Sequence, residues 1–230
     1  MILVTGATGH IGNVLVRKLV QQGEIVRVLA LPGESRTSLQ GLAVEVVEGN
    51  VLDPASCRAA MAGTKVVYHL AGIIAIAPGT EQLMWKVNVE GARTVAQAAL
   101  AAGVSRLVHV GSVHAFARQP GDVVDERTPL ALTAPRNNYD RTKAEGVAAV
   151  LDVATAGLDV VAACPSGVIG PHDYLGSEMG RLVRSLARPG HHLLVDGGFD
   201  FVDVRDVAEG LIQAAAQGSR GEIYILSGTY

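Results

Sequence analysis

The 230-residue sequence contains only two cysteines, Cys57 and Cys164, which lie far apart along the chain. This scarcity excludes a disulfide framework and the paired spacing of a zinc site, and it fits a reducing, cytoplasmic setting. The seven histidines form no H-x-x-E-H or H-x-x-x-H pattern with acidic neighbours. We therefore expect no metal site.

The sequence also lacks the basic patch that nucleic-acid binding requires, because its formal net charge is −3. Arg181, Arg184 and Arg188 come nearest to a cluster, and their spacing is typical of a solvated helix face, with an anionic ligand as the alternative. No apolar run approaches the roughly 20 residues of a membrane span. No signal peptide precedes the glycine turn at residue 6. We expect neither nucleic acid nor a membrane as a partner.

The first twelve residues are the most informative stretch of the chain. An apolar run over 2–4 is followed by Gly6, Gly9 and Gly12, and then by apolar residues at helical spacing. The pattern predicts a strand, a tight turn that glycine permits, and a helix whose N-terminus attracts phosphate. The spacing G-x-x-G-x-x-G differs by one residue from the dinucleotide fingerprint. It predicts dinucleotide binding, with a purely structural turn as the alternative.

Strands and helices alternate along the first 164 residues. The sequence predicts strands at 2–4, 25–31, 44–47, 66–70, 107–110 and 160–163, and helices at 11–20, 54–61, 81–102 and 139–156. This alternation predicts an α/β fold with a Rossmann-type, doubly wound parallel sheet. Right-handed crossovers then bring the predicted strand ends at Gly6, Gly72, Ser112 and Pro165 to one edge, where ligands bind.

The alternation loosens after Pro165. The sequence predicts helices at 179–187 and 204–216 and strands at 191–195 and 223–226. We therefore divide the chain into a dinucleotide-binding Rossmann domain over 1–164, a small, partial substrate-side lobe over 165–200, and a return to the first domain over 201–230.

Tyr139 and Lys143 stand four residues apart at the start of a predicted helix, so their side chains share one face. A nearby ammonium favours the phenolate and lowers the pKa of a phenol. Such a pair exchanges a proton with a substrate oxygen. The spacing alone is common on solvated helices, but here it follows a glycine turn and a serine, Ser112, at a strand end.

Six motifs follow one another along the chain: TGATGHIG at 5–12, HLAG at 69–72, NVEG at 88–91, Ser112, YDRTK at 139–143 and PSGVIGP at 165–171. In this order they resemble the extended short-chain dehydrogenases/reductases, the NAD(P)-dependent epimerase/dehydratase family, and within it the bacterial dihydroflavonol-reductase-like and sugar-epimerase-like branch. The resemblance covers essentially the whole chain. It implies hydride transfer between NAD(P) and a carbonyl or secondary alcohol.

The resemblance also implies a role for each matching residue. Tyr139 would be the general acid/base, Lys143 would tune it and hold the nicotinamide ribose, and Ser112 would hydrogen-bond the reacting oxygen. His114 would contact the substrate, with a structural role in its loop as the alternative, and Asn88 has helix packing as its alternative. The residues that would contact the cofactor, besides Tyr139 and Lys143, are Gly6, Thr8, Gly9, His10, Ile11, Gly12, Arg36, Asn50, Val51, Leu70, Ala71, Gly72, Asn88, Pro165 and Val168.

Several positions depart from the family's pattern. The second strand ends in Leu-Ala-Leu at 29–31, without the carboxylate that binds the ribose of NAD and without an arginine at 31. Arg36 near the 2′-position favours NADP slightly over NAD, with Glu34 on a ribose hydroxyl as the alternative. Asn50 replaces the aspartate of the adenine loop. Phe199 stands where nucleotide-sugar epimerases carry a diphosphate-binding arginine, which favours a smaller or less charged substrate.

Two expectations concern the end of the chain. We expect Asp206 to be a helix N-cap or a structural residue rather than a substrate ligand. Family members typically extend further, so the chain is expected to be either a naturally short form or a truncated one.

Three functions remain open from the sequence: an oxidoreductase, an epimerase or dehydratase with retained cofactor, and a non-catalytic NAD(P)-binding regulatory protein. The missing diphosphate arginine disfavours the second, and the presence of Ser112, Tyr139 and Lys143 disfavours the third. The expected partners are a small carbonyl or alcohol substrate and a second copy of the chain, paired through the helices predicted at 81–102 and 139–156.

Overall fold

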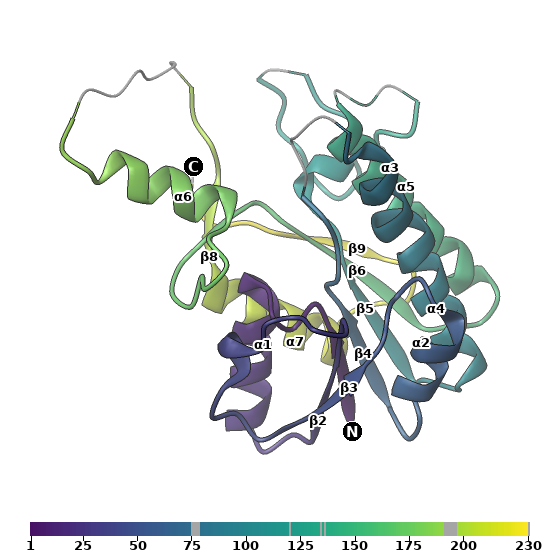
Figure 1. Cartoon of the computed structure of the whole chain (residues 1–230). Coiled ribbons are helices and arrows are strands. Elements are labelled where there is room, and N and C mark those ends of the chain that lie inside the picture. The colour runs from purple at the N-terminus through teal and green to yellow at the C-terminus, as the bar shows by residue number, and fades with distance from the viewer. Residues whose placement is uncertain (75–78, 120, 134, 136, 191–196, 230) are drawn as a thin grey trace.

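A parallel seven-stranded sheet forms the centre of the molecule (Figure 1). The computed structural model describes residues 1–74, 79–119, 121–133, 135, 137–190 and 197–229. The strand order is β3-β2-β1-β4-β5-β6-β9, so the chain winds outward from β1 in both directions. This confirms the predicted Rossmann-type sheet. The strands are β1 (Ile2–Thr5), β2 (Val26–Ala30), β3 (Val44–Glu48), β4 (Val66–His69), β5 (Arg106–Val110), β6 (Val160–Pro165) and β9 (Ile223–Leu226).

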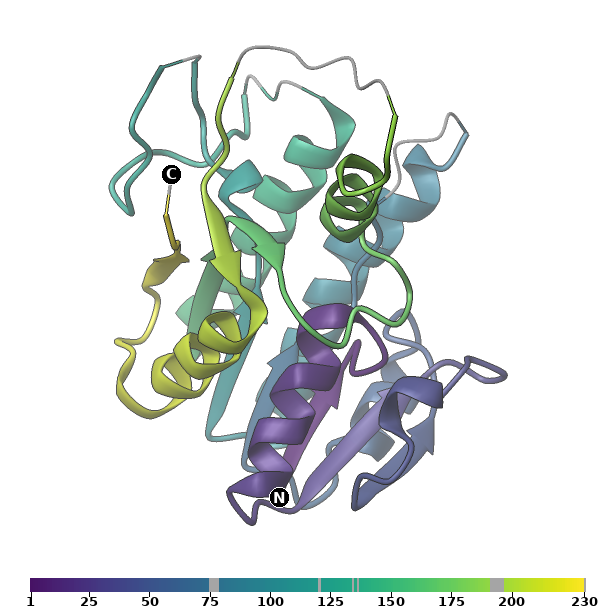
Figure 2. The same ribbon diagram turned by 90° about the vertical axis from the view of Figure 1, so that its left-hand side faces the viewer.

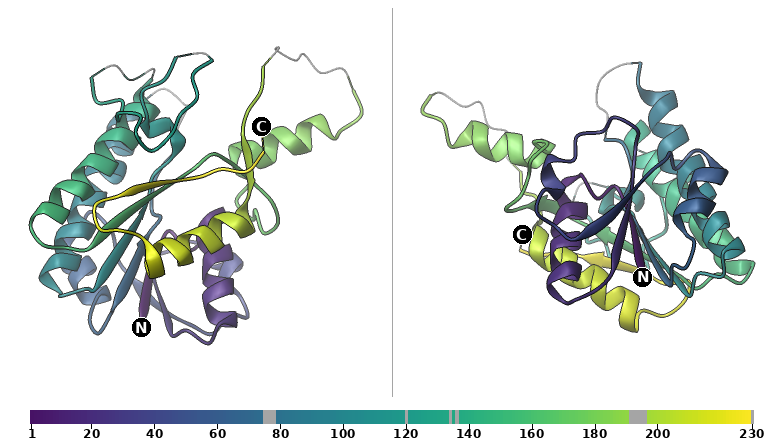
Figure 3. Two further views of the ribbon diagram at one scale, coloured as in Figure 1. Left: turned by 180° about the vertical axis from the view of Figure 1, so that it is seen from behind. Right: turned by 60° about the horizontal axis from the view of Figure 1, so that its bottom comes forward.

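Helices cover both faces of this sheet, and for that reason its central strands are apolar on both sides. On one face lie α1 (His10–Gln21) and α7 (Val204–Gln217), and on the other lie α2 (Pro54–Ala60), α4 (Ala92–Ala101) and α5 (Asn138–Thr155) (Figure 3). Within β1, Ile2 and Val4 pack toward α1 and α7, whereas Leu3 packs toward α2 and α4. The two cores hold the sheet rigid beneath its C-terminal edge.

The helix predicted at 81–102 is not continuous. It consists of α3 (Glu81–Trp85), a π-helical segment η2 (Lys86–Gly91) and α4. A π-turn inserts one extra residue per turn and is often found at functional sites. Asn88 lies in this wider turn, where it is buried.

A second, two-stranded parallel sheet, β7 (Gly167–Ile169) with β8 (Phe201–Asp203), was not predicted, because three-residue strands leave almost no periodic signal. In the sequence, α6 (Glu178–Leu186) follows β7 and precedes β8. None of its residues is buried. Figure 2 shows α6 on the side of the molecule where β7 and β8 pair. The strand predicted at 191–195 lies outside the described residues.

The C-terminal part rejoins the main layers, since β9 pairs with β6 and α7 lies beside α1. Asp203 caps α7 by accepting a hydrogen bond from the backbone N–H of Arg205 at 2.8 Å. Asp206 lies within the first turn of α7, so its prediction as an N-cap was wrong. The division into three sequence segments stays a prediction.

Within the described residues there are also two short 3-10 segments, η1 (Thr37–Leu39) and η3 (Val113–Ala115). None of the helices in the described part of the chain is both long and apolar enough to cross a lipid bilayer.

Candidate active site

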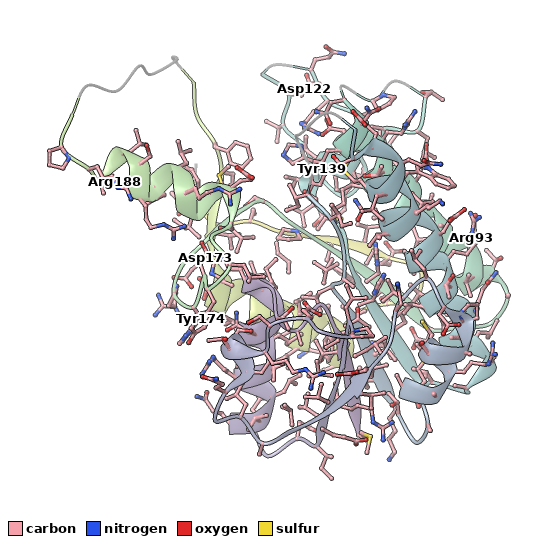
Figure 4. All side chains as sticks on the ribbon, in the orientation of Figure 1. Arg93, Asp122, Tyr139, Asp173, Tyr174 and Arg188 are labelled. Atoms are coloured by element: carbon pink, nitrogen blue, oxygen red, sulfur yellow. The ribbon has the colours of Figure 1, made fainter. Side chains whose placement is uncertain are left out.

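A cavity of about 700 Å³ opens at the C-terminal edge of the main sheet. Its lining comes from the loops after β1, β4, β5 and β6, from α3 (Glu81–Trp85), from the starts of α5 and α6, and from Phe199, segments that lie far apart in the sequence. Figure 1 shows α6 facing the N-terminal end of α5 across this edge, and Figure 4 labels Tyr139 there. The predicted site residues that line the cavity are Gly6, Gly9, His10, Ile11, Gly12, Leu70, Gly72, Ser112, His114, Tyr139, Lys143, Pro165 and Val168.

The glycine turn after β1 is packed too closely for side chains. Gly6 has a φ of 69°, and a Cβ atom there would lie 2.6 Å from the backbone nitrogen of Ala71. A Cβ atom on Gly12 would lie 2.1 Å from the carbonyl oxygen of Gly6. The N-cap of α1 is Gly9, which supplies no side-chain hydrogen bond. The exposed N–H groups at this helix start fit an anionic ligand such as the phosphates of a dinucleotide.

Asn88 connects the loop after β4 to helix α5. Its Oδ1 accepts a hydrogen bond from the backbone N–H of Ile73 at 2.8 Å, and its Nδ2 donates to the carbonyl of Ile73 at 3.0 Å and to the hydroxyl of Thr142 at 3.1 Å. Asn88 does not line the cavity in the structure. These contacts are of the kind expected from the helix-packing alternative, and contact with a cofactor stays a prediction.

Tyr139 and Ser112 both line the cavity near the C-terminal end of β5. Burial has the larger effect on the pKa of the Tyr139 phenol and raises it to about 12, whereas Ser112 lowers it. The Nζ atom of Lys143 lies 6.0 Å from the centre of the tyrosine ring. The expectation that the ammonium lowers the pKa of this phenol is corrected by the structure, because burial outweighs the favourable contacts. At neutral pH the phenol therefore carries its proton.

Lys143 lies in a buried setting, which lowers the pKa of its ammonium. Two buried histidines lie nearby at the C-terminal ends of neighbouring strands. His69 on β4 and His109 on β5 are register partners, and their ring centres are 5.3 Å apart. Nδ1 of His69 lies 2.7 Å from the hydroxyl of Thr5. Burial, together with the nearby Lys143 charge, lowers the pKa of His69 to about 3. These rings are therefore neutral supports of the site.

His114 lines the cavity beside Tyr139, with ring centres 5.3 Å apart in an edge-to-face arrangement. Its Nδ1 atom lies 2.8 Å from the buried carboxylate of Asp140. The ring also stacks on Phe199 at 6.4 Å between centres. Asp140 was not predicted as a site residue, although it stands directly after the tyrosine of the YDRTK motif.

Thr8 and the loop after β2 meet at the other end of the glycine turn. The Thr8 hydroxyl donates to the carboxylate of Glu34, which also accepts a hydrogen bond from the backbone N–H of Leu31 at 2.9 Å. Arg36 forms an ion pair with Glu48 on β3. The loop after β2 thus carries a carboxylate, Glu34, four residues beyond the end of the strand.

Three further predicted residues make structural contacts away from the cavity lining. The side-chain oxygen of Asn50 accepts a hydrogen bond from the backbone N–H of Leu52 at 2.9 Å. Val51 is buried in the core beneath α2. The backbone N–H of Ala71 donates to the hydroxyl of Thr5 at 3.2 Å.

The cavity also has lining residues that the sequence analysis did not assign to the site. Two of them stand at positions that a sequence can indicate, because asparagine and serine are favoured at helix N-caps. Asn137 is the N-cap of α5 and Ser177 is the N-cap of α6. The others have no local pattern that marks them, because tertiary contacts bring them to the edge. The complete set is Ile74, Glu81, Met84, Val110, Gly111, Asn137, Asn138, Ser166, Gly167, Ser177, Glu178, Met179 and Phe199.

This geometry agrees with the comparison to known families. The model of the NAD dependent epimerase/dehydratase family matches residues 2–227. The chain belongs to this family. It is accordingly an NAD(P)-dependent enzyme of the oxidoreductase and epimerase type, as the six motifs predicted.

Individual relatives cover nearly the whole chain. Sterol demethylase protein B of Methylococcus capsulatus is 39% identical over 99% of this chain and 70% of its own length. The 4-hydroxy-2-methyl-3-oxo-4-farnesyl-3,4-dihydroquinoline-1-oxide ketoreductase of Stigmatella aurantiaca is 32% identical over 97% of this chain and 67% of its own length. The chain thus spans about two thirds of the length of these relatives.

A solved structure is also similar throughout. The DesIV double mutant of Streptomyces venezuelae, a dTDP-glucose 4,6-dehydratase with NAD and DAU bound, is 26% identical. The match has a TM-score of 0.88 and covers 100% of this chain and 76% of that chain. This NAD-bound structure therefore shares the arrangement of layers described above.

Proposed function

We propose that the chain reduces a ketone or aldehyde to an alcohol with a nicotinamide cofactor, and catalyses the reverse oxidation. The single observation that carries this proposal is the meeting of Ser112, Tyr139 and Lys143 with the glycine turn in one cavity. A proton donor, a hydrogen-bond donor and a phosphate-binding helix start are thereby within reach of one bound substrate.

The proposed reaction adds a hydride and a proton to the carbonyl group. When bound, a reduced nicotinamide would supply the hydride that the carbonyl carbon accepts. The carbonyl oxygen takes the electron pair of its π bond and then the phenolic proton of Tyr139, which water replaces after release of the alcohol. The Ser112 hydroxyl holds the same oxygen, and the Lys143 ammonium stabilises the transient phenolate. The raised pKa of Tyr139 supports a resting proton donor.

The proposed substrate is weakly charged and largely apolar. Among the described residues lining the cavity, Lys143 is the sole lysine or arginine. Phe199 lines the cavity at the position where nucleotide-sugar epimerases carry the diphosphate-binding arginine. Without an arginine to form charge-assisted hydrogen bonds to a second diphosphate, the lining disfavours a nucleotide-diphosphate sugar. The names of the sterol and farnesyl-quinoline relatives support an apolar substrate of this kind.

We propose NAD rather than NADP as the preferred cofactor, which reverses the slight preference drawn from the sequence. The support is the Glu34 carboxylate, held against Thr8 of the glycine turn. A carboxylate there accepts hydrogen bonds from the ribose hydroxyls and repels a 2′-phosphate. Arg36, the candidate for binding that phosphate, is paired with Glu48.

We propose a homodimer formed through α3, α4 and α5. The support is the exposed apolar surface of this layer, where Leu83 and Leu100 are 52% and 36% exposed. Light scattering on the purified chain should report a dimer, and Leu83→Glu or Leu100→Glu should shift it toward the monomer. A monomeric wild type would contradict this proposal.

We propose a cytoplasmic location, because both cysteines are present as free thiols rather than as a disulfide. Cys57 and Cys164 are free and buried. Burial raises the pKa of Cys57 to about 11 and that of Cys164 to about 12, so neither thiol is activated for disulfide exchange. Cell fractionation would test the location.

The reductase proposal is tested by the nicotinamide absorbance of the purified full chain. Consumption of NADH by apolar ketones, reduced about 100-fold or more in Tyr139→Phe, is the expected result. Stoichiometric cofactor that is released only on denaturation would instead favour the epimerase or dehydratase. Cofactor binding without turnover, unchanged by Tyr139→Phe, would favour the regulatory protein.

A further inference from the structure

Two buried histidines each carry a ring nitrogen without a hydrogen-bond partner. His69, at the end of β4, is 1% exposed, and His109, on β5, is 5% exposed. Nε2 of His69 and Nδ1 of His109 are both buried, and neither forms a hydrogen bond with the described residues. Leaving a buried polar atom unpaired costs free energy, so native proteins satisfy such atoms with protein groups or with ordered water. Two unpaired nitrogens on neighbouring rings indicate a shared partner.

The strand order places the unpaired nitrogen of His69 on the side of His109. In the main sheet, β4 lies between β1 and β5 (Figure 1). Nδ1 of His69 faces β1, because it lies 2.7 Å from the hydroxyl of Thr5. Nε2 lies across the same ring, so it faces β5, where His109 is the register partner of His69.

The distance between the two rings fits one bridging water molecule. The ring centres are 5.3 Å apart, so the imidazoles are neighbours without being stacked in direct contact. A water molecule that hydrogen-bonds to two nitrogens, each at about 2.9 Å, holds them roughly 5 Å apart. The separation of the rings is of this size.

Water suits this position whichever ring nitrogens carry the protons. Burial lowers the pKa of both histidines, so both rings are neutral, and each has one N–H donor and one acceptor nitrogen. Water both donates and accepts, so it satisfies an unpaired nitrogen of either kind. A metal ion requires further ligands, and the described part of the chain holds no group of three metal-ligating side chains.

The Lys143 ammonium lies beside the same two rings. Its charge acts on both imidazoles. Its Nζ atom lies 3.7 Å from the position of a Cβ atom built on Gly72, three residues after His69. Among the described residues, none accepts a hydrogen bond from this ammonium. Because an ammonium has three hydrogens to donate, a water molecule held between the rings can accept one of them.

We propose that His69 and His109 bind a water molecule between their unpaired nitrogens, and that this water accepts a hydrogen bond from Nζ of Lys143. The two histidines are then positioning residues, which act on the reaction through the lysine. The anchored ammonium keeps its charge directed at the phenol of Tyr139 while the proton leaves. The water site stands on the geometry of the two rings, whereas its effect on turnover rests on the proposed function.

A crystal structure of the purified full chain tests the water site directly. The expected result is an ordered water within about 3.2 Å of Nε2 of His69, of Nδ1 of His109 and of Nζ of Lys143. The same water should be absent from a crystal structure of His109→Leu. A wild-type map that shows other buried waters but none between these rings would overturn the proposal.

Two substitutions of His109 separate the bound water from the volume of the ring. Leucine fills a similar volume but offers the water no partner, so His109→Leu should lower kcat for a ketone about tenfold, the effect of one hydrogen bond to a charged group. The KM for the ketone should change little, because the ketone does not contact this residue. Asparagine carries a polar atom near the position of Nδ1, so His109→Asn should recover most of the lost kcat. Full kcat in His109→Leu, or an equal loss in both folded variants, would overturn the positioning role.

The matched control is Tyr68→Phe, because Tyr68 is the neighbouring residue on β4 and packs in the core beneath α1 and α7, on the other face of the sheet. It removes a buried polar group away from the site and should keep the wild-type kcat, and thermal melting should establish that each variant is folded. Failure of the reductase proposal gives a different result. In that case the wild type reduces no ketone and Tyr139→Phe changes nothing, while the crystal structure of the wild type still decides whether the water is bound.

Discussion

A Cβ atom added to Gly146 of α5 would lie 2.4 Å from the backbone oxygen of Asn88 in the π-turn. The close approach of these two residues places one turn of α5 directly against the widened part of the neighbouring helix. A Cβ atom on Gly72 would lie 3.1 Å from Oδ1 of Asn88 and 3.7 Å from Nζ of Lys143. The position of the lysine therefore depends on how closely α5 packs at Gly146.

Replacing Gly146 with alanine should destabilise the fold. The added methyl group forces α5 away from Asn88, at a cost of about 1–3 kcal/mol that exceeds the gain of about 1 kcal/mol in helix propensity. Urea denaturation would measure the loss. Asp152→Ala on the exposed side of α5 is the control and should change stability by less than about 0.5 kcal/mol. A more stable Gly146→Ala variant would show that α5 does not need this contact.

The two directions of the reaction should differ in their pH dependence. Reduction requires the protonated phenol of Tyr139, which persists up to its raised pKa of about 12, so the reductive rate should vary little with this group across neutral pH. Oxidation requires the phenolate, so kcat/KM for an alcohol should rise about tenfold per pH unit below that pKa. Initial rates in both directions measure the two profiles. An oxidation rate that is flat above neutrality would indicate a different base.

The sheet and its ligand-binding edge could be predicted from the sequence, because strand-helix alternation and the glycine turn are local signals. The tyrosine and lysine share a helix face for the same local reason. The break in the helix at Asn88 could not be predicted in this way. It arises from hydrogen bonds to Ile73 and Thr142, which lie 15 and 54 positions away.

The pKa of Tyr139 shows a second limit of sequence reasoning. The spacing to Lys143 predicts a stabilised phenolate, but it says nothing about burial, and burial dominates in the folded chain. Glu34 was considered beside Arg36, yet only the folded loop places its carboxylate against Thr8. Contacts between segments that are distant in the sequence decide both the protonation state of Tyr139 and the proposed cofactor preference.

Replacing Glu34 with glutamine should reduce the preference for NADH over NADPH. The amide removes the negative charge near the 2′-position, so kcat/KM with NADPH should rise while that with NADH falls by about tenfold. Steady-state kinetics with both cofactors on one ketone measure the ratio. Arg36→Ala is the control, since its pair with Glu48 is exposed on the surface and worth at most about 1 kcal/mol. A wild type that prefers NADPH, with Arg36→Ala abolishing that preference, would contradict the role of Glu34.

The buried pair His69 and His109 should make the protein sensitive to mild acid. Burial lowers the pKa of His69 to about 3 and that of His109 well below its usual value, whereas both histidines in the unfolded chain take up a proton near pH 6.5. Between these values the unfolded state binds more protons, so stability is full above about pH 6.5 and falls as the pH decreases, by about 1.4 kcal/mol per pH unit for each histidine. His109→Leu removes one of the two titrating groups and should lessen this slope by up to that amount in urea denaturation between about pH 4.5 and pH 7. An unchanged slope in His109→Leu would mean that His109 is already protonated in the folded protein.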